Sequence, residues 1–171
     1  MIRFITGGAR SGKSSRAERL AAESGREVIY IATARGEDAE MRARLASHRA
    51  RRPAHWHTIE EPLALTRVIR EQQGPERCLL IDCLTLWVTN LLLAEADLHV
   101  EREALIAELA CARGEIILVS NETGMGVVPM GELSRRFVDE SGWLHQAVAA
   151  RADQVVLMVA GLPLTVKGDR L

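Results

Sequence analysis

Short, almost continuously apolar runs recur along the chain, separated by segments in which apolar residues follow helical spacing. Runs of this kind, rich in β-branched residues, are typical of strands buried on both faces of a parallel sheet. They predict strands over residues 2–6, 27–34, 78–85, 115–122 and 154–161, with an additional edge strand over 164–167.

The segments between these runs predict helices. Gly25 suits the position just after a helix end, and Pro53 closes a segment that opens with an acidic turn. The predicted helices span 13–24, 38–51, 61–72, 86–96, 99–113 and 131–152, and Gly142 is a place where the last could be interrupted.

Strands that alternate with helices predict an α/β fold with a doubly wound, mostly parallel sheet and helices on both faces. In such a sheet ligands bind at the carboxyl ends of the strands. Functional residues are therefore expected directly after residues 6, 34, 85, 122 and 161.

Composition narrows the class of protein. The 171 residues suit a single domain, and 47% hydrophobic with 26% charged residues is an ordinary globular balance. A net charge of −1 argues against a general nucleic-acid binder. Cys78, Cys83 and Cys111 form no CxxC pair, which predicts reduced thiols in a cytoplasmic protein. The apolar stretches are shorter than the ~20 residues of a membrane helix, and no signal peptide is expected at the start.

The strongest local signal is "GGARSGKS", Gly7 to Ser14, which fits G-x-x-x-x-G-K-[ST] between a predicted strand and a predicted helix. The glycines let backbone N–H groups curl around phosphate oxygens. Lys13 can reach the β- and γ-phosphates, and the Ser14 hydroxyl can bind Mg²⁺. The helix that follows directs its positive dipole end at the anion. The pattern predicts a nucleotide-binding P-loop.

Two further segments follow predicted buried strands. Asp82 in "LLIDCLT" could hold Mg²⁺ or its water, or could simply cap the next helix. The loop 120–129, "SNETGMGVVP", would place Asn121 and Glu122 at the same sheet edge, or could be only a strand-to-helix turn. Both alternatives stay open at this point.

The segment "SHRARRPAHWH" concentrates histidine and arginine. At helical spacing His48 shares a face with Arg44, Arg51 and Arg52, and burying several unpaired charges would cost too much for a core position. The cluster is either a solvated basic face or a group arranged around an anion. A P-loop elsewhere favours the anion, because guanidinium groups bind phosphate and a neutral imidazole can attack phosphorus. His55 and His57 are interpreted as ordinary loop histidines.

Five ordered segments, "TGGARSGKS", "YIATA", "AEMRARLASHRARRPAHWHTIEEP", "LLIDCLTLWVTNLL" and "VSNETGMGVVP", are spread over residues 6–129 of the chain. Together they closely resemble the bifunctional adenosylcobinamide kinase / adenosylcobinamide-phosphate guanylyltransferase family of cobalamin biosynthesis. The resemblance implies a RecA-like P-loop fold, a homo-oligomer that is typically a trimer, and two activities. ATP or GTP phosphorylates adenosylcobinamide with Mg²⁺ as cofactor; GMP from GTP then passes through a histidine to the phosphorylated corrinoid, giving adenosylcobinamide-GDP.

The resemblance also implies roles for particular residues. His48 resembles the guanylylated histidine, with Ser47 where relatives can carry a second histidine, and Lys13 would meet the charge on the leaving phosphates. Asp82 resembles an acidic residue that can be glutamate in relatives, and Glu60 or Glu61 resembles an acid on the guanine or ribose side. The implied nucleotide contacts are Gly7, Gly8, Ala9, Arg10, Ser11, Gly12, Lys13, Ser14, Ala32, Thr33, Ala34, Arg49, Ala50, Arg51, Arg52, Glu60, Glu61 and Asp82, with Ser14 and Asp82 toward the metal.

Two other functions remain as alternatives. The first is a P-loop kinase of small molecules that lacks the guanylyl transfer and forms no covalent GMP adduct. The second is a RecA-like nucleotide-binding module that acts on nucleic acid or as a regulatory partner, which the net charge and the lack of an extended basic stripe disfavour.

Overall fold

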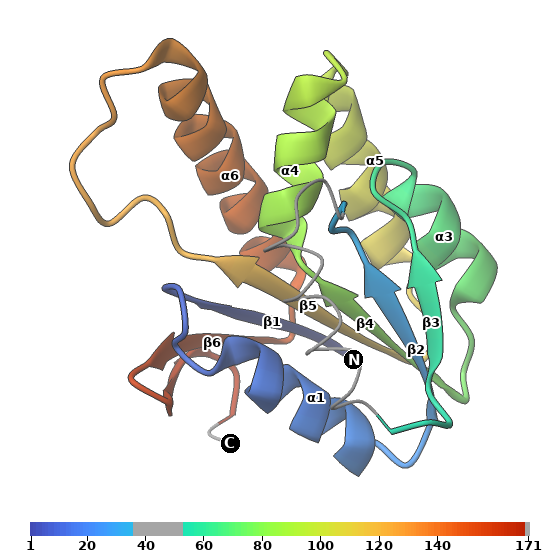
Figure 1. The fold of residues 1–171 in the computed structure, drawn as a ribbon. Coiled ribbons are helices and arrows are strands. Elements are labelled where there is room, and N and C mark those ends of the chain that lie inside the picture. Colours follow the sequence, from blue (N-terminus) through green and yellow to red (C-terminus); the bar gives the residue numbers. More distant parts are fainter. Residues whose placement is uncertain (36–52, 170–171) are drawn as a thin grey trace.

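The computed structural model describes residues 1–35 and 53–169. Within these ranges seven strands form one sheet in the order β3-β2-β4-β5-β1-β6-β7 (Figure 1). Neighbouring strands are parallel except for β7, which runs antiparallel to β6 at one edge. The strands are β1 Ile2–Gly7, β2 Glu27–Ala32, β3 His57–Glu60, β4 Arg77–Asp82, β5 Glu115–Asn121, β6 Gln154–Val159 and β7 Leu162–Lys167.

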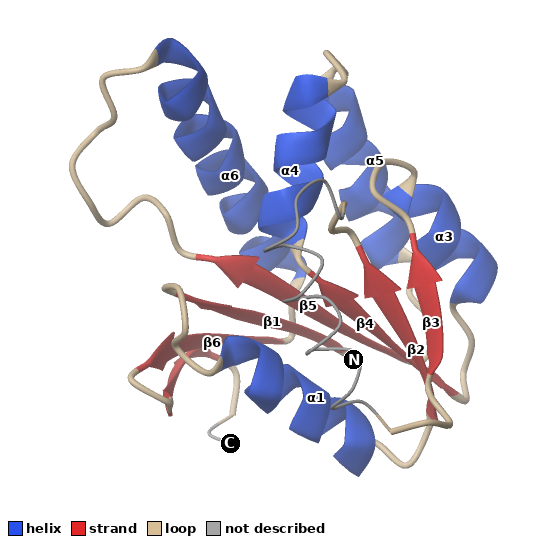
Figure 2. Cartoon of the chain, viewed as in Figure 1, coloured by secondary structure: helices blue, strands red, loops and turns tan. Residues whose placement is uncertain are grey.

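Helices cover both faces of the sheet (Figure 2). Helix α1, Lys13–Glu23, lies on one face. The other face carries α3 Leu65–Gln72, α4 Leu84–Leu93, α5 Leu98–Ala110 and α6 Glu132–Arg151. This confirms the predicted α/β architecture, and the described chain follows the predicted alternation of strands and helices with one additional strand.

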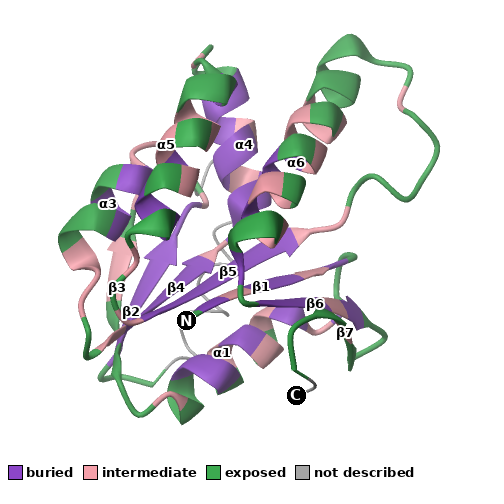
Figure 3. Ribbon diagram, turned by 180° about the vertical axis from the view of Figure 1, so that it is seen from behind, coloured by how far each residue is buried: buried purple, intermediate pink, exposed green. Residues whose placement is uncertain are grey.

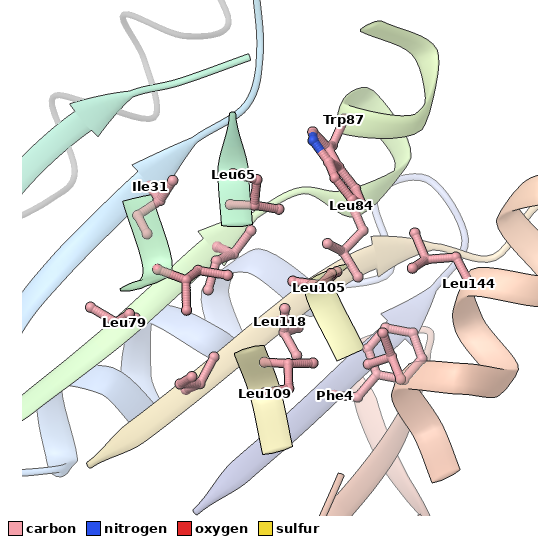
Figure 4. Close-up of a cluster of buried hydrophobic side chains, with 14 of the residues drawn as sticks. Phe4, Ile31, Leu65, Leu79, Leu84, Trp87, Leu105, Leu109, Leu118 and Leu144 are labelled. Carbon is pink, nitrogen blue, oxygen red and sulfur yellow. The ribbon is translucent and has the colours of Figure 1, made fainter. Parts of the chain in front are cut away.

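Two apolar cores explain why the strands are almost continuously apolar. Alternate side chains of one strand point to opposite faces, so Phe4 of β1 packs in the core beneath α3–α6 while Ile5 packs in the core beneath α1. Figure 4 shows part of the first core, where Phe4, Leu79 and Leu118 from the sheet meet Leu105 and other helix residues. Each fully buried leucine contributes about 1.5–3 kcal/mol relative to an exposed one.

The prediction was wrong at the start of the 61–72 segment. Strand β3 precedes it and was not predicted, because its four residues, "HTIE", are too few and too polar to form a clear alternating pattern. The helix begins at Leu65 and not at residue 61. Pro62 follows Glu61, and the chain turns through residues 61–64 before the helix starts.

Other boundaries differ by a few residues. β2 ends at Ala32, two residues early, and β4 ends at Asp82 because α4 begins at Leu84. Helix α6 continues through Gly142 without a break, since packing of the helix against the sheet outweighs the ~1 kcal/mol that a helical glycine costs. The predicted edge strand is confirmed as β7, although it starts at Leu162. The predicted helix 38–51 lies outside the described residues.

Apolar side chains are exposed on two parts of the surface, the β5–α6 connection and β7. Figure 3 shows exposed residues along the β5–α6 connection and along β7, in contrast to the buried central strands. Met125, Val127, Val128 and Met130 of that connection are largely exposed, as are Leu162 and other apolar residues of β7. None of the helices in the described ranges is long and apolar enough to span a bilayer.

Candidate active site

The loop Gly7–Ser14 joins the carboxyl end of β1 to the first turn of α1, where the sequence predicted a P-loop. A Cβ on Gly7 would lie 2.6 Å from the carbonyl oxygen of Met158 on the neighbouring strand β6. Gly12 has φ 93°, and a Cβ there would lie 3.3 Å from the Cα of Gly161. The backbone N–H of Ser11 donates to the Gly8 carbonyl at 3.2 Å and closes the turn. The two glycines of the motif are therefore required by close backbone approach.

Lys13 is the first residue of α1 and is only 9% exposed. Its Nζ donates to the carbonyl oxygen of Gly8 at 3.1 Å, so the ammonium group lies against the first half of the loop. Ser14 follows at the second position of the helix and is partly exposed. A buried ammonium beside curled backbone amides can bind a polyphosphate.

Asp82 ends β4, two strands away from β1 in the sheet. The Tyr30 hydroxyl donates to its Oδ2 at 3.0 Å, and the peptide bond to Cys83 is cis. Burial, with the Asp82 charge adding to it, raises the pKa of Cys83 to about 11, so the thiol stays protonated at neutral pH. Asp82 does not provide a side-chain cap for α4. The Asp82 carboxylate and the Ser14 hydroxyl are hard oxygen donors, of the kind that Mg²⁺ prefers.

Thr33 is fully buried just beyond β2. Its Oγ1 accepts from the backbone N–H of Cys83 at 2.9 Å and donates to the Cys83 carbonyl at 2.7 Å. The Nδ2 of Asn90 donates to the Thr33 carbonyl at 2.7 Å. Among the predicted contacts 32–34, the Thr33 side chain thus joins two strand ends, Ala32 is buried, and Ala34 is partly exposed.

Glu60 and Glu61 differ in their structural surroundings. Glu61 Oε1 accepts from the backbone N–H groups of Leu63 and Ala64 at 3.0 and 2.9 Å, and Oε2 accepts from Arg67 at 3.0 Å. Burial alone would raise its pKa, but the two amides and the Arg67 guanidinium outweigh burial and hold the pKa below its ordinary value. Glu61 therefore holds the turn that leads into α3, whereas Glu60 is exposed at the end of edge strand β3.

The predicted histidine cluster lies mostly outside the described residues. His48, Arg49, Ala50, Arg51 and Arg52 belong to the range 36–52, which connects Arg35, beyond the carboxyl end of β2, to Pro53, ahead of β3. His57 is exposed at the amino end of β3, and His55 precedes it. Since β2 and β3 are parallel, His57 lies at the sheet end opposite to the P-loop.

One polar cluster was not predicted from the sequence. Thr85 Oγ1 and Ser120 Oγ lie 3.0 Å apart, and Ser120 Oγ lies 2.7 Å from His145 Nε2. Thr85 Oγ1 also accepts from the Asn121 backbone N–H at 2.6 Å. Burial lowers the pKa of His145, although the charge of Glu122 opposes this. The available signal was that His145 follows the buried Ser141 by four residues on the inward face of α6.

Curated proteins of similar sequence match nearly the whole chain. The chain is similar to the bifunctional adenosylcobalamin biosynthesis protein CobP of Pseudomonas aeruginosa, with 64% identity over 170 residues covering 98% of both chains. It is 41% identical over 182 residues to the corresponding protein CobU of Escherichia coli, covering 98% of this chain and 100% of the relative.

Solved structures with low sequence identity share the fold. The flagellar accessory protein FlaH of Methanocaldococcus jannaschii matches with a TM-score of 0.59 and 13% identity, covering 98% of this chain and 78% of FlaH. The RadB recombinase matches with a TM-score of 0.54 and 18% identity, covering 91% and 73%. The fold is RecA-like.

A family model described as cobinamide kinase / cobinamide phosphate guanyltransferase matches residues 3–166. This match covers the P-loop and the carboxyl ends of β1 to β6. The chain belongs to the cobinamide kinase / cobinamide phosphate guanyltransferase family.

Proposed function

We propose that this protein phosphorylates adenosylcobinamide with ATP or GTP, and then transfers GMP from GTP to the phosphorylated corrinoid through a covalent guanylyl group on His48. The observation that carries the proposal is the P-loop, in which the Lys13 ammonium group donates to the Gly8 carbonyl, in a chain that the family model matches almost completely. The product would be adenosylcobinamide-GDP.

The P-loop would hold the triphosphate in both steps. Backbone amides of Gly7–Ser14 bind phosphate oxygens, and the Lys13 ammonium neutralises charge that develops on the leaving phosphates. Ser14 and Asp82 would hold Mg²⁺, which when bound to the nucleotide withdraws charge from the phosphates. The hydrogen bond from Tyr30 supports this role by fixing one Asp82 oxygen beside the site.

Other contacts would position the nucleoside and its phosphates. Glu60, which is exposed at the end of β3, is the candidate for the acid on the guanine or ribose side, and Glu61 binds two backbone amides and Arg67 in the turn before α3. Ala32 and Ala34 would contribute backbone contacts at the end of β2. The guanidinium groups of Arg49, Arg51 and Arg52, with the backbone at Ala50, would orient phosphates.

In the guanylyl step, a neutral imidazole nitrogen of His48 would attack the α-phosphorus of GTP. A nitrogen–phosphorus bond forms, the bond from the α-phosphorus to the bridging oxygen breaks, and pyrophosphate leaves with that electron pair. A phosphate oxygen of the phosphorylated corrinoid then attacks the same phosphorus and releases the histidine. Two displacements split one difficult transfer into two easier ones.

The test is covalent labelling with α-³²P-GTP and Mg²⁺. The wild-type protein should carry acid-labile, alkali-stable label, and His48→Asn should carry none while it keeps most of its kinase activity. His57→Asn is the matched control, since His57 lies at the opposite end of the sheet from the P-loop, and it should label normally. Label that persists in His48→Asn would contradict the assignment, and absence of label in the wild type would favour a kinase without guanylyl transfer.

Three further features belong to the proposal. Residues 1–171 would act as one domain, which the single sheet and the relatives' full-length alignment support. The protein would be a homotrimer, which the exposed apolar side chains of the β5–α6 connection and β7 support. It would be cytoplasmic, which the free thiols of Cys78, Cys83 and Cys111 support.

A further inference from the structure

Acidic side chains follow several strands at the carboxyl edge of the sheet, at different distances from the P-loop strand β1. Neighbouring strands are about 4.8 Å apart. Glu122 follows β5, which is next to β1; Asp82 ends β4, the second strand from β1; Glu60 ends β3, the fourth. Their strand ends therefore lie about 5, 10 and 19 Å from β1 across the sheet. Of the three acids, Glu122 follows the strand nearest to β1, which leads into the P-loop.

Glu122 is attached directly to the P-loop. Its backbone N–H donates to the carbonyl oxygen of Gly7, the first residue of the loop, at 2.9 Å. Its Oε1 accepts from the backbone N–H of Gly124 at 2.6 Å, which fixes the side chain in the turn after β5. The second oxygen, Oε2, has no hydrogen-bond donor among residues 1–35 and 53–169. One carboxylate oxygen is thus anchored while the other is left to bind a proton.

Hydrogen bonds to side chains of α4 and α6 hold the strand end that carries Glu122. The Asn121 backbone N–H donates to Thr85 Oγ1, and that hydroxyl lies 3.0 Å from Ser120 Oγ. Ser120 Oγ in turn lies 2.7 Å from the ring of His145 on α6. A base that must meet a hydroxyl proton within hydrogen-bond reach needs a supporting structure of this kind.

We propose that Glu122 is the general base of the kinase step, an inference that rests on the proposed function. The acceptor hydroxyl of the corrinoid gives its proton to the Glu122 carboxylate as its oxygen bonds to the γ-phosphorus. The bond from the γ-phosphorus to the β,γ-bridging oxygen breaks, and the nucleoside diphosphate leaves with that electron pair. The proton later passes from Glu122 to water, so that charge and atoms balance.

The other two acids are less suited to this task. Asp82 already accepts a hydrogen bond from Tyr30 and lies where it would serve the metal. Glu60 is separated from β1 by three strands. Glu122 is also distinct from the machinery of the guanylyl step, in which His48 needs no acceptor hydroxyl to be deprotonated.

The test is Glu122→Gln in the full-length protein. Glutamine keeps an oxygen that can accept from the Gly124 N–H but cannot take a proton, so the turn is preserved. We expect kcat for phosphorylation of adenosylcobinamide by γ-³²P-ATP to fall by about 100-fold or more, with KM for ATP changed by less than about threefold. Self-labelling by α-³²P-GTP should stay near the wild-type rate. Glu122→Asp, which restores a carboxylate, should recover part of the lost kcat.

Glu132→Gln is the control, because Glu132 is exposed at the start of α6, at the far end of the same connection. It should leave both activities unchanged. The inference is overturned if Glu122→Gln lowers kinase kcat by less than about tenfold, or if it lowers kinase activity and self-labelling equally, as a structural role would. Wild-type protein that does not phosphorylate adenosylcobinamide would overturn the proposed function, and the inference with it.

Discussion

The side chain of Thr33 is used entirely within the fold, although it lies among the residues that the family resemblance places at the nucleotide. Its hydroxyl both accepts from and donates to the backbone of Cys83, and the two residues belong to neighbouring strand ends. A buried backbone group left without a partner costs about 1–3 kcal/mol, so the hydroxyl is a structural requirement. Any nucleotide contact in this segment would fall to the backbone and to Ala34.

Thr33→Val tests this at the residue scale. Valine has nearly the same shape but leaves the Cys83 N–H and carbonyl without their partner, so the free energy of unfolding in urea should fall by about 1–3 kcal/mol. Thr165→Val is the control, because Thr165 lies partly exposed on edge strand β7, and this variant should change stability by less than about 0.5 kcal/mol. Equal stability of the two variants would contradict the role given to Thr33.

Among the elements, helix α3 depends on the side chain of Glu61, which stabilises the turn directly before the helix. Its carboxylate binds the N–H groups of Leu63 and Ala64 in the turn before the helix, and this negative charge lies near the positive end of the helix dipole. Sequence spacing alone placed Glu61 inside the helix, since an acidic residue suits both a first turn and a cap. The chain turns after Pro62, and for this reason Glu61 lies before the helix and not in its first turn.

Because the folded-state pKa of Glu61 lies below its ordinary value of 4.5, its charge stabilises the fold above that pH. The contribution is lost as pH falls from 4.5 through the lower, folded-state pKa. Glu61→Gln should therefore be less stable than wild type by about 0.3–1 kcal/mol at pH 7, and the difference should shrink below pH 4.5.

Urea unfolding at several pH values measures this difference. Glu71→Gln is the control, since Glu71 also pairs with Arg67 but is half exposed and caps no helix. That variant should show little change at any pH. A gap between wild type and Glu61→Gln that widens as the pH falls would show that the charge of Glu61 does not support α3.

At the scale of the whole molecule, the sequence predicts what is contiguous and strongly patterned. The β1–P-loop–α1 unit was predicted because its chemistry lies within eight residues, and the central strands because burial on both faces requires continuous apolar runs. Strand β3 was not, because four residues at a sheet edge are defined by pairing with β2 and not by their own pattern. The Thr85–Ser120–His145 cluster joins three distant segments, and only the order of the strands brings them together.

The P-loop exists only in the folded chain, so nucleotide binding should stabilise the whole molecule. At a concentration of Mg-ATP about 100 times Kd, binding contributes about 2.7 kcal/mol, which corresponds to a rise in Tm of about 5–10 °C for a chain of this size. Lys13→Met should abolish most of this rise. It should not lower Tm without nucleotide, because an apolar side chain of similar length replaces a buried ammonium group.

Lys167, the other lysine of the chain, gives the opposite pattern. Its Nζ donates to the carbonyl oxygens of Ala149 and Ala150 near the end of α6, so Lys167→Met should lower Tm without nucleotide and keep the full rise with it. Both variants are compared by thermal unfolding at one protein concentration, since oligomerisation makes Tm depend on concentration. A nucleotide-dependent rise in Lys13→Met equal to that of wild type would mean that the triphosphate binds elsewhere than at the Gly7–Ser14 loop.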